Sequence, residues 1–320
     1  MLNSNITLHF SIYTQFAGLL NFVIMKYIFL SLLILSGAAS AQQKIDVQAH
    51  RGGRALMPEN TIPAMINAIN LGVRTLELDC VISADNQVVV SHDVYMSADF
   101  MRRPDGKDID KKEEKSYVIF NMNYDSIRKF DAGTKPHPQF PDQKKMKTYK
   151  PLLSELIDSV EAYVKKHHLK PVYYNMETKC SPAGDGKLHP APDMFSTLVM
   201  DVINKKHIAE RVTIQSFDIR TLQIIHMDFP KLKTALLVFN QEGLDANIKT
   251  LGFTPTIYSP YYSVVTPELV KAAHEKKVAV LPWTVNETAD MEKMISYGVD
   301  GIITDAPDKL VKVAGSYQQK

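Results

Sequence analysis

The stretch from Thr75 to His92 reads Thr-Leu-Glu-Leu-Asp-Cys-Val-Ile-Ser-Ala-Asp-Asn-Gln-Val-Val-Val-Ser-His. Its first part, 75–81, is a mostly apolar run that predicts a buried β-strand. The polar residues 83–87 are a turn signal, and the strand pattern that follows them has no helix before it. We therefore predict that this strand runs past the rim of its sheet and folds back as a hairpin. With Asp85-Asn86 as a two-residue turn, His92 lies opposite Asp79 and points to the same face.

Outward from this hairpin, short β-rich runs alternate with helical patterns along the whole chain after residue 44. The other strands are predicted at 45–50, 172–177, 212–216, 234–239, 256–259, 278–283 and 301–304. Helices are predicted at 61–71, 152–168, 193–206, 218–228, 243–250, 266–276, 287–297 and 306–313. Strands that are each followed by a helix predict an irregular (β/α)8 TIM barrel in one domain over 42–320. A doubly wound open sheet is the alternative, because periodicity does not show closure.

The segment 94–150 breaks this alternation. It is charged, it contains Asp110-Lys111-Lys112-Glu113-Glu114-Lys115, and it ends in a loop around Pro136 and Pro138. It is too long for an ordinary connection, and catalytic loops of barrels follow strands. We interpret it as an insertion that acts as a lid or specificity element, with a surface decoration as an equal alternative.

The first 41 residues predict export. Lys26 precedes an apolar run over 27–35, and Ala39-Ser40-Ala41 places small residues where signal peptidase cuts. We expect a signal peptide cleaved after Ala41 and a periplasmic or secreted protein. Met25 stands where such a peptide normally starts, so residues 1–24 are interpreted as a mis-assigned start. An uncleaved anchor is the alternative, although the apolar run is short for a bilayer span, and no span is expected in the mature chain.

Composition narrows the class of protein. The 320 residues are 45% hydrophobic and 22% charged, which is typical of a globular chain. A net charge of +2 without a long basic run argues against a nucleic-acid partner. Export permits a disulfide between Cys80 and Cys180, but two cysteines do not establish one, and we expect both to be buried. The sequence does not indicate an oligomeric state.

Acidic side chains gather at two predicted strand ends. Glu77 and Asp79 are two residues apart and so share a face, as do Asn175, Glu177 and Lys179. The ends of parallel barrel strands meet at one rim, where several carboxylates repel unless positive charge lies among them. Oxygen ligands favour a hard cation over zinc. The pattern predicts a site for Mg²⁺ or Ca²⁺.

Two histidines and two permanent cations are expected at the same rim. His50 and His92 each end a strand, and imidazole can accept one proton and donate another near neutral pH. Arg51 has forked donors that suit phosphate oxygens, and Lys179 adds a compact cation. A metal ion, an arginine and a lysine around one space are typical of a phosphate site.

Taken together, these residues resemble the signature of the glycerophosphodiester phosphodiesterase family. The resemblance covers essentially the whole mature chain, in order. Its pieces are His50-Arg51-Gly52, Pro58-Glu59-Asn60-Thr61, Glu77-Leu78-Asp79, His92-Asp93, Glu177-Thr178-Lys179, Gln215-Ser216-Phe217-Asp218, Trp283-Thr284-Val285-Asn286 and Asp300-Gly301-Ile302-Ile303-Thr304-Asp305.

The resemblance implies metal-dependent hydrolysis of a small glycerophosphodiester to glycerol 3-phosphate and an alcohol. The roles that it implies are cation ligation by Glu77, Asp79 and Glu177, acid–base catalysis by His50 and His92, phosphate binding by Arg51 and Lys179, and substrate contacts by Glu59 and Trp283. It leaves open which alcohol is preferred, which histidine is the acid, and whether the ion is Ca²⁺ or Mg²⁺.

Two other functions remain open at the level of the sequence. A phospholipase-like or sphingomyelinase-D-like enzyme would share the barrel and the acids but act on lipids, and it would need an apolar rim. Tyr258, Pro260, Tyr261 and Tyr262 are the local hint of such a rim. A non-catalytic binding barrel is the second alternative, and the intact set of two histidines and three acids argues against it.

Overall fold

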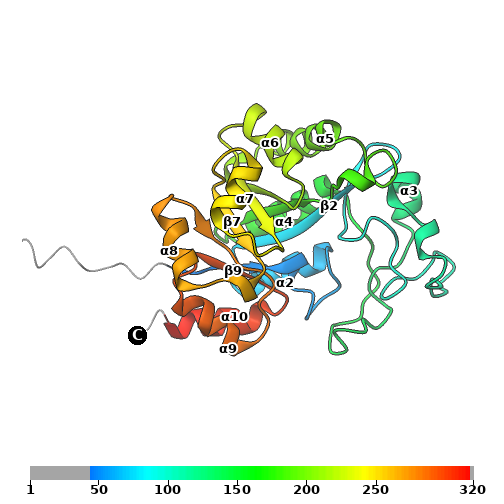
Figure 1. Cartoon of the computed structure of the whole chain (residues 1–320). Helices are drawn as coiled ribbons and strands as arrows, with labels where there is room; N and C mark the ends of the chain where they lie inside the picture. The colour runs from blue at the N-terminus through cyan, green and yellow to red at the C-terminus, as the bar shows by residue number, and fades with distance from the viewer. Residues whose placement is uncertain (1–43, 318–320) are drawn as a thin grey trace, which may run out of the picture. The chain divides into compact units, whose positions relative to one another are not determined.

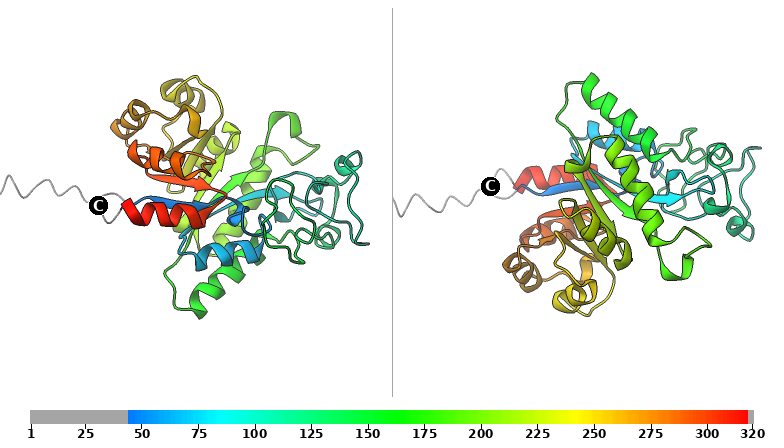
Figure 2. Two further views of the ribbon diagram at one scale, coloured as in Figure 1. Left: turned by 90° about the horizontal axis from the view of Figure 1, so that it is seen from below. Right: turned by 90° about the horizontal axis from the view of Figure 1, so that it is seen from above.

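The computed structural model describes residues 44–317, which form a barrel of parallel strands with helices around its outside (Figures 1 and 2). The predicted signal peptide lies outside the described residues. The strands are β1 (Asp46–Ala49), β2 (Thr75–Ile82), β3 (Val88–Val90), β4 (Tyr173–Thr178), β5 (Val212–Ser216), β6 (Lys233–Val238), β7 (Ile257–Pro260), β8 (Ala279–Val280) and β9 (Gly301–Thr304).

The parallel strands follow the order β8-β7-β6-β5-β4-β2-β1-β9, and β3 pairs antiparallel with β2. The seam between the first and last strands of this order is closed by backbone hydrogen bonds. The N–H of Val285 donates to the carbonyl of Ile303 at 3.0 Å, and the N–H of Ile303 donates to the carbonyl of Pro282 at 3.0 Å. The predicted barrel is therefore confirmed, and the open doubly wound sheet is excluded.

The helices pack their apolar faces onto the outer face of the sheet. In α4 the residues Leu153, Leu156, Ile157, Val160 and Val164 are buried, at the spacing of one helix face. No helix between residues 44 and 317 has the length and apolar character to cross a membrane. The helices are α2 (Ile62–Asn70), α3 (Tyr124–Ile127), α4 (Leu153–Lys166), α5 (Pro192–Lys205), α6 (Ile219–Asp228), α7 (Leu244–Leu251), α8 (Pro267–Glu275), α9 (Thr288–Ser296) and α10 (Pro307–Tyr317).

The β2–β3 hairpin forms as predicted, but its predicted register was wrong by one residue. Val81 pairs with Val89, and the N–H of Ser91 donates to the carbonyl of Asp79 at 3.0 Å, so Ser91 rather than His92 lies opposite Asp79. The turn has three residues because Asn86 adopts a left-handed conformation with φ 57°, which asparagine tolerates better than most residues. The strand ends at Val90, and the chain then bends, so His92 still reaches the carboxyl end of the parallel strands, near His50.

The segment 94–150 lies beside the barrel (Figures 1 and 2), and its apolar side chains form a second hydrophobic core. Val81 and Val89 of the hairpin contribute to this core, whereas Cys80 and Val90 belong to the core of the barrel. The insertion is therefore packed onto the hairpin as a folded unit. Its second-core residues include Met96, Phe100, Met101, Ile109, Ile119, Tyr124, Ile127 and Phe130.

A tight turn leaves β1 at the carboxyl end of the parallel strands. Arg51, Gly52 and Gly53 have successive positive φ angles of 52°, 80° and 88°. Gly52 lies against α2 so closely that an added Cβ atom would meet the Cβ of Ala64 at 2.7 Å and its backbone carbon at 3.0 Å. Glycine is therefore required here both for its conformation and for the close approach.

We expect Gly52→Ala to destabilise the fold more than Gly72→Ala does. Both positions have positive φ, which costs an L-residue about 1–2 kcal/mol, but nothing lies within 4 Å of an added Cβ at Gly72. Overpacking against α2 should add about 1–3 kcal/mol at Gly52 alone. Urea unfolding of both variants measures the difference, and equal losses would show that α2 yields to the added methyl group.

Candidate active site

Three acidic side chains from β2 and β4 meet inside the catalytic end of the barrel. Asp79 and Glu177 are register partners on the two strands, and Glu77 lies two residues before Asp79 on the same face. One carboxylate oxygen of each lies within 4.8 Å of one oxygen of the other two. All three are buried, with exposed fractions of 1%, 0% and 8% for Glu77, Asp79 and Glu177.

The charge on these acids is not balanced by their hydrogen bonds. Burial, and then the negative charge of Asp79, raises the pKa of Glu77 well above its ordinary value. Burial by itself also raises the pKa of Asp79, but His92, Lys179 and Arg51 together hold it below its ordinary value. One oxygen of Asp79, Oδ1, is buried without a hydrogen-bond partner. A buried oxygen of this kind, beside two further carboxylates, fits a hard divalent cation.

The orientation of the acids is fixed by hydrogen bonds that the sequence did not predict. The backbone N–H of Arg51 and the side-chain amide of Gln215 donate to the two oxygens of Glu77, each at 2.7 Å. Asn60 donates to Asp79 Oδ2 at 2.7 Å and accepts from the N–H of Asp79 at 3.2 Å. Asn60 and Gln215 lie within motif pieces that the sequence showed, but their side-chain partners depend on the fold.

His50 follows β1 and is held by a carboxylate from the other end of the chain. Its Nδ1 lies 2.5 Å from Oδ1 of Asp305, directly after β9. Asp305 also accepts hydrogen bonds from Arg54 at 2.7 Å and from Asn286 at 2.8 Å. Burial lowers the pKa of His50 to about 4, against the opposing effect of Asp305. The imidazole is therefore neutral near pH 7, with its other nitrogen free of the Asp305 contact.

His92 follows β3 and is supported by the insertion. Its Nδ1 lies 2.9 Å from Oδ1 of Asp93, and its side chain is 32% exposed. Lys150, at the end of the insertion, is 3% exposed and donates to Ser91 Oγ at 2.7 Å. Ser91 in turn donates to the backbone carbonyl of Asp93 at 2.6 Å. Lys150 thus braces the loop that carries His92, and the sequence did not indicate this residue.

The two predicted phosphate-binding cations both lie near Asp79. Arg51 is bound by both oxygens of Glu59, at 3.1 and 3.2 Å, and its Nε lies 3.5 Å from Asp79. Lys179 donates to Glu177 at 2.8 Å and lies 3.8 Å from Asp79. Glu59 therefore stands behind Arg51, where it fixes the guanidinium.

These residues surround a cavity of about 150 Å³ at the barrel mouth. The structure brings seven of the nine predicted site residues to its wall, while Asp79 and Glu59 do not line it. Trp283 forms part of the opposite side, with its indole N–H bound to the carbonyl of Ser259 at 2.9 Å. The lining residues are His50, Arg51, Arg54, Glu77, His92, Glu177, Lys179, Gln215, Phe217, Leu237, Trp283, Thr284 and Ile303.

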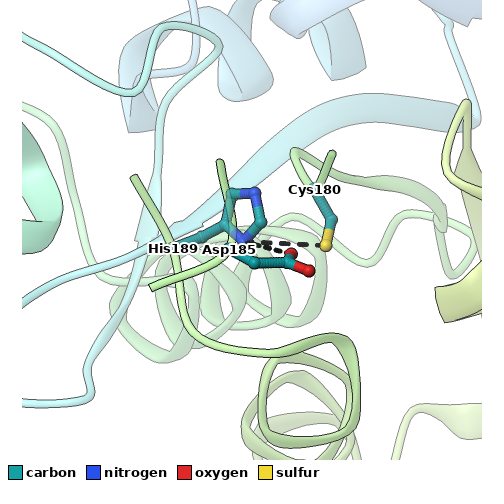
Figure 3. Close-up of side chains that lie close together, drawn as sticks. All are labelled: Cys180, Asp185 and His189. Carbon is teal, nitrogen blue, oxygen red and sulfur yellow. Dashed lines mark hydrogen bonds and ion pairs between the residues drawn. The ribbon is translucent and has the colours of Figure 1, made fainter. Parts of the chain in front are cut away.

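A second group with metal-ligand chemistry lies just beyond β4, where Cys180, Asp185 and His189 face one another (Figure 3). His189 Nδ1 is 3.7 Å from Cys180 Sγ and 3.8 Å from Asp185. However, Nδ1 lies 2.8 Å from the carbonyl of Pro190, and Nε2 accepts from the N–H of Ser181 at 3.0 Å. These contacts place the ring proton on Nδ1 and leave neither nitrogen with a free lone pair.

The other two members of this group are also occupied. The guanidinium of Arg220 binds both oxygens of Asp185, at 2.6 and 3.0 Å, and reaches Asp218 at 2.6 Å. Burial raises the pKa of Cys180 to about 12, so its thiol is protonated. Both cysteines of the chain are free and buried. The group therefore has a structural role: its hydrogen bonds and ion pairs fix the loop that follows Lys179.

Comparison with known proteins agrees with this geometry. Residues 50–309 match the model of the glycerophosphoryl diester phosphodiesterase family. The glycerophosphodiester phosphodiesterase of Caldanaerobacter subterraneus is 31% identical over 272 residues, 84% of this chain and 98% of the relative. A glycerophosphoryl diester phosphodiesterase structure from Silicibacter pomeroyi has a TM-score of 0.76 and 30% identity, covering 86% of this chain and 94% of the other.

A more distant structure has the same fold. The phosphodiesterase of Oleispira antarctica, solved with its product sn-glycerol-3-phosphate, is 20% identical with a TM-score of 0.67, and the match covers 84% of this chain and 96% of that one. The family model alone spans most of the barrel, from His50 to Lys309. The chain therefore belongs to the glycerophosphoryl diester phosphodiesterase family.

Proposed function

We propose that the chain hydrolyses small glycerophosphodiesters to glycerol 3-phosphate and an alcohol, with a divalent cation held by Glu77, Asp79 and Glu177. The observation that carries this proposal is the arrangement of two histidines, two permanent cations, Glu77 and Glu177 around one cavity, with an oxygen of Asp79 within 4.8 Å of both acids. Lys179 and Arg51 lie where they can bind phosphate oxygens. Mg²⁺ and Ca²⁺ both suit the oxygen ligands.

The fit of the cation rests on the three acids themselves. Asp79 Oδ1 lacks a hydrogen-bond partner, and burial, followed by the negative charge of Asp79, raises the pKa of Glu77. When bound, such an ion supplies positive charge to a phosphoryl oxygen. Gln215 and the backbone of Arg51 keep Glu77 oriented, and Asn60 does the same for Asp79.

In this proposal His50 accepts a proton and His92 donates one. The substrate's own glycerol hydroxyl attacks phosphorus as His50 takes its proton, and the bond from phosphorus to the alcohol breaks as His92 protonates the leaving oxygen. Water then opens the cyclic phosphate, with the two histidines in reversed roles. His50 suits the first step because it is neutral and held by Asp305, and His92 suits the second because it lies nearer to solvent.

The cation requirement is tested by the release of glycerol 3-phosphate from glycerophosphocholine. EDTA should abolish the release, and Mg²⁺ or Ca²⁺ should restore it. The same ion should raise the melting temperature, since a ligand at a hundred times its Kd stabilises by about 2.7 kcal/mol.

Asp79→Asn should lose both the thermal shift and at least about a hundredfold in activity. Asp245→Asn, on an exposed carboxylate of α7, is the control. Full activity in EDTA would refute the cation.

His50→Ala and His92→Ala should each lose at least about a hundredfold in kcat/KM, because acid–base groups contribute about 10² to 10⁴. Both variants should melt within a few degrees of the parent, as neither side chain is part of the hydrophobic core. The double variant should lose less than the product of the single losses. A folded single variant with parental turnover would remove that histidine from the mechanism.

The acid limb of the parent's pH profile should follow His50. A neutral His50 is needed as base, so kcat/KM should fall as the pH drops through the pKa of His50, about 4. The charge of Asp305 raises this pKa, so Asp305→Asn should move the limb to lower pH. A limb that stays in place in Asp305→Asn would assign it to another group.

We further propose that the protein is exported to the periplasm or the medium and cleaved after Ala41. The support is the succession of Lys26, the apolar run and Ala39-Ser40-Ala41. Mass spectrometry of protein from the native source should find Gln42 at the N-terminus. An intact start at Met1 or Met25 would disprove cleavage.

A further inference from the structure

Lys150, the last residue of the insertion, is a buried basic residue outside the wall of the catalytic cavity. It is 3% exposed and is not among the residues that line the cavity. Its Nζ donates to Ser91 Oγ at 2.7 Å and lies 5.7 Å from the centre of the Phe100 ring. Burying a lysine is unfavourable, and an apolar side chain would pack against Phe100 without that penalty. The hydrogen bond to Ser91 is therefore the contact that distinguishes a lysine here.

The backbone around Lys150 is fixed to the hairpin. The N–H of Val90 donates to the carbonyl of Pro151 at 2.9 Å, and Leu152 forms an antiparallel bridge with Val89. The chain that leaves the insertion therefore runs alongside β3. Lys150 is thus held in a defined place beside the residues that follow this strand.

Ser91 joins Lys150 to the loop of His92, and the direction of its hydrogen bonds is fixed. The hydroxyl group has one proton, which it donates to the carbonyl of Asp93 at 2.6 Å. Its oxygen therefore accepts from Lys150. Ser91 is fully buried, and its backbone N–H donates to the carbonyl of Asp79 at 3.0 Å. Without the Lys150 nitrogen, this buried oxygen would lose its donor and the loop would lose a support.

Asp93 is the link between Ser91 and the ring of His92. Its carbonyl is bound by Ser91, while its carboxylate lies 2.9 Å from Nδ1 of His92. The imidazole is 32% exposed and makes no other hydrogen bond within the part of the chain that the structure describes. The position of the ring therefore depends on Asp93 and on the contacts that hold Asp93.

The charge of Lys150 also acts on Asp93. Burial raises the pKa of Asp93, but its hydrogen bond to His92 and the charges of His92 and Lys150 lower it to about 2. Asp93 is therefore ionised near pH 7, and a carboxylate only accepts hydrogen bonds. It keeps a proton on Nδ1 of His92, so Nε2 is the nitrogen left for a substrate in the cavity that His92 lines.

We propose that Lys150 is a positioning residue for the acid step, acting on His92 through Ser91 and Asp93. This inference rests on the proposed function, in which His92 protonates the leaving alcohol. As the bond from phosphorus to that oxygen breaks, the oxygen keeps the electron pair and takes the proton from Nε2 of His92. Lys150 exchanges no proton in this step. It holds Nε2 near the departing oxygen, and through this one side chain the insertion affects the chemistry.

The test compares two leaving groups. Glycerophosphocholine releases an alcohol that must be protonated, whereas the p-nitrophenyl ester of glycerol 3-phosphate releases p-nitrophenolate, which is stable without a proton. Lys150→Met should lower kcat/KM at least about tenfold for glycerophosphocholine but less than about threefold for the nitrophenyl ester, because a small displacement of a catalytic group can cost about a hundredfold. Inhibition by glycerol 3-phosphate should stay within about twofold, since the interaction lost is not one with the bound phosphate.

A second variant and a matched control accompany Lys150→Met. Ser91→Ala, which keeps the lysine, should show the same dependence on the leaving group, and it carries the test by itself if Lys150→Met does not fold. The double variant should lose no more than about twofold beyond the larger single loss, because the two residues act as one unit. Lys147→Met, on an exposed lysine of the same segment, is the control and should turn over both substrates like the parent.

The variant His92→Ala separates this inference from the proposed function. It should lose far more activity on glycerophosphocholine than on the nitrophenyl ester, and equal losses would overturn His92 as the acid. If His92→Ala shows the leaving-group effect while Lys150→Met and Ser91→Ala lose equally on both substrates, the role of Lys150 alone is overturned. Parental turnover of glycerophosphocholine by folded Lys150→Met would overturn it as well.

Discussion

The repulsion among three buried carboxylates is the constraint on which the rest of this structure depends. Glu77, Asp79 and Glu177 occupy the end of a closed barrel, where water does not screen their charges. Isolated charges in such a place are very unfavourable. The protein meets the constraint with cations around them and with donors such as Gln215 and Asn60, but Asp79 Oδ1 remains buried without a hydrogen-bond partner. The protein alone therefore resolves the conflict incompletely, and this supports the cation that we propose.

Much of the fold could be predicted from the sequence because a parallel barrel repeats one pattern, a strand followed by a helix. Alternating strands and helices predicted the barrel, and two-residue spacing placed Glu77 and Asp79 on one face. The hairpin register was missed because Asn86 adds a third turn residue through a left-handed conformation that a polar turn sequence does not specify. The Asp305–His50 contact joins residues 255 positions apart, so only barrel closure brings it about.

The insertion was predicted either as a lid or as decoration, and it contacts the loops that carry both histidines. Lys150 binds Ser91 beside His92, while Gln143 donates to the backbone carbonyl of Arg54 at 2.7 Å, near the loop of His50. Burial lowers the pKa of Lys150, yet the lysine lies where Asp93 and Glu59 favour its charge. No sequence motif marks Lys150 or Gln143. Their role depends on which loops the fold brings next to them, so the sequence did not predict it.

The two faces of the β2–β3 hairpin pack into two different hydrophobic cores. Its side chains alternate, so Cys80 and Val90 face the barrel while Val81 and Val89 face the insertion. The packing of the two cores is therefore coupled. A change of packing in either core shifts the hairpin, which carries Asp79 and leads to His92. A substitution in the insertion, far from the site residues, therefore has a mechanical route to the site through this hairpin.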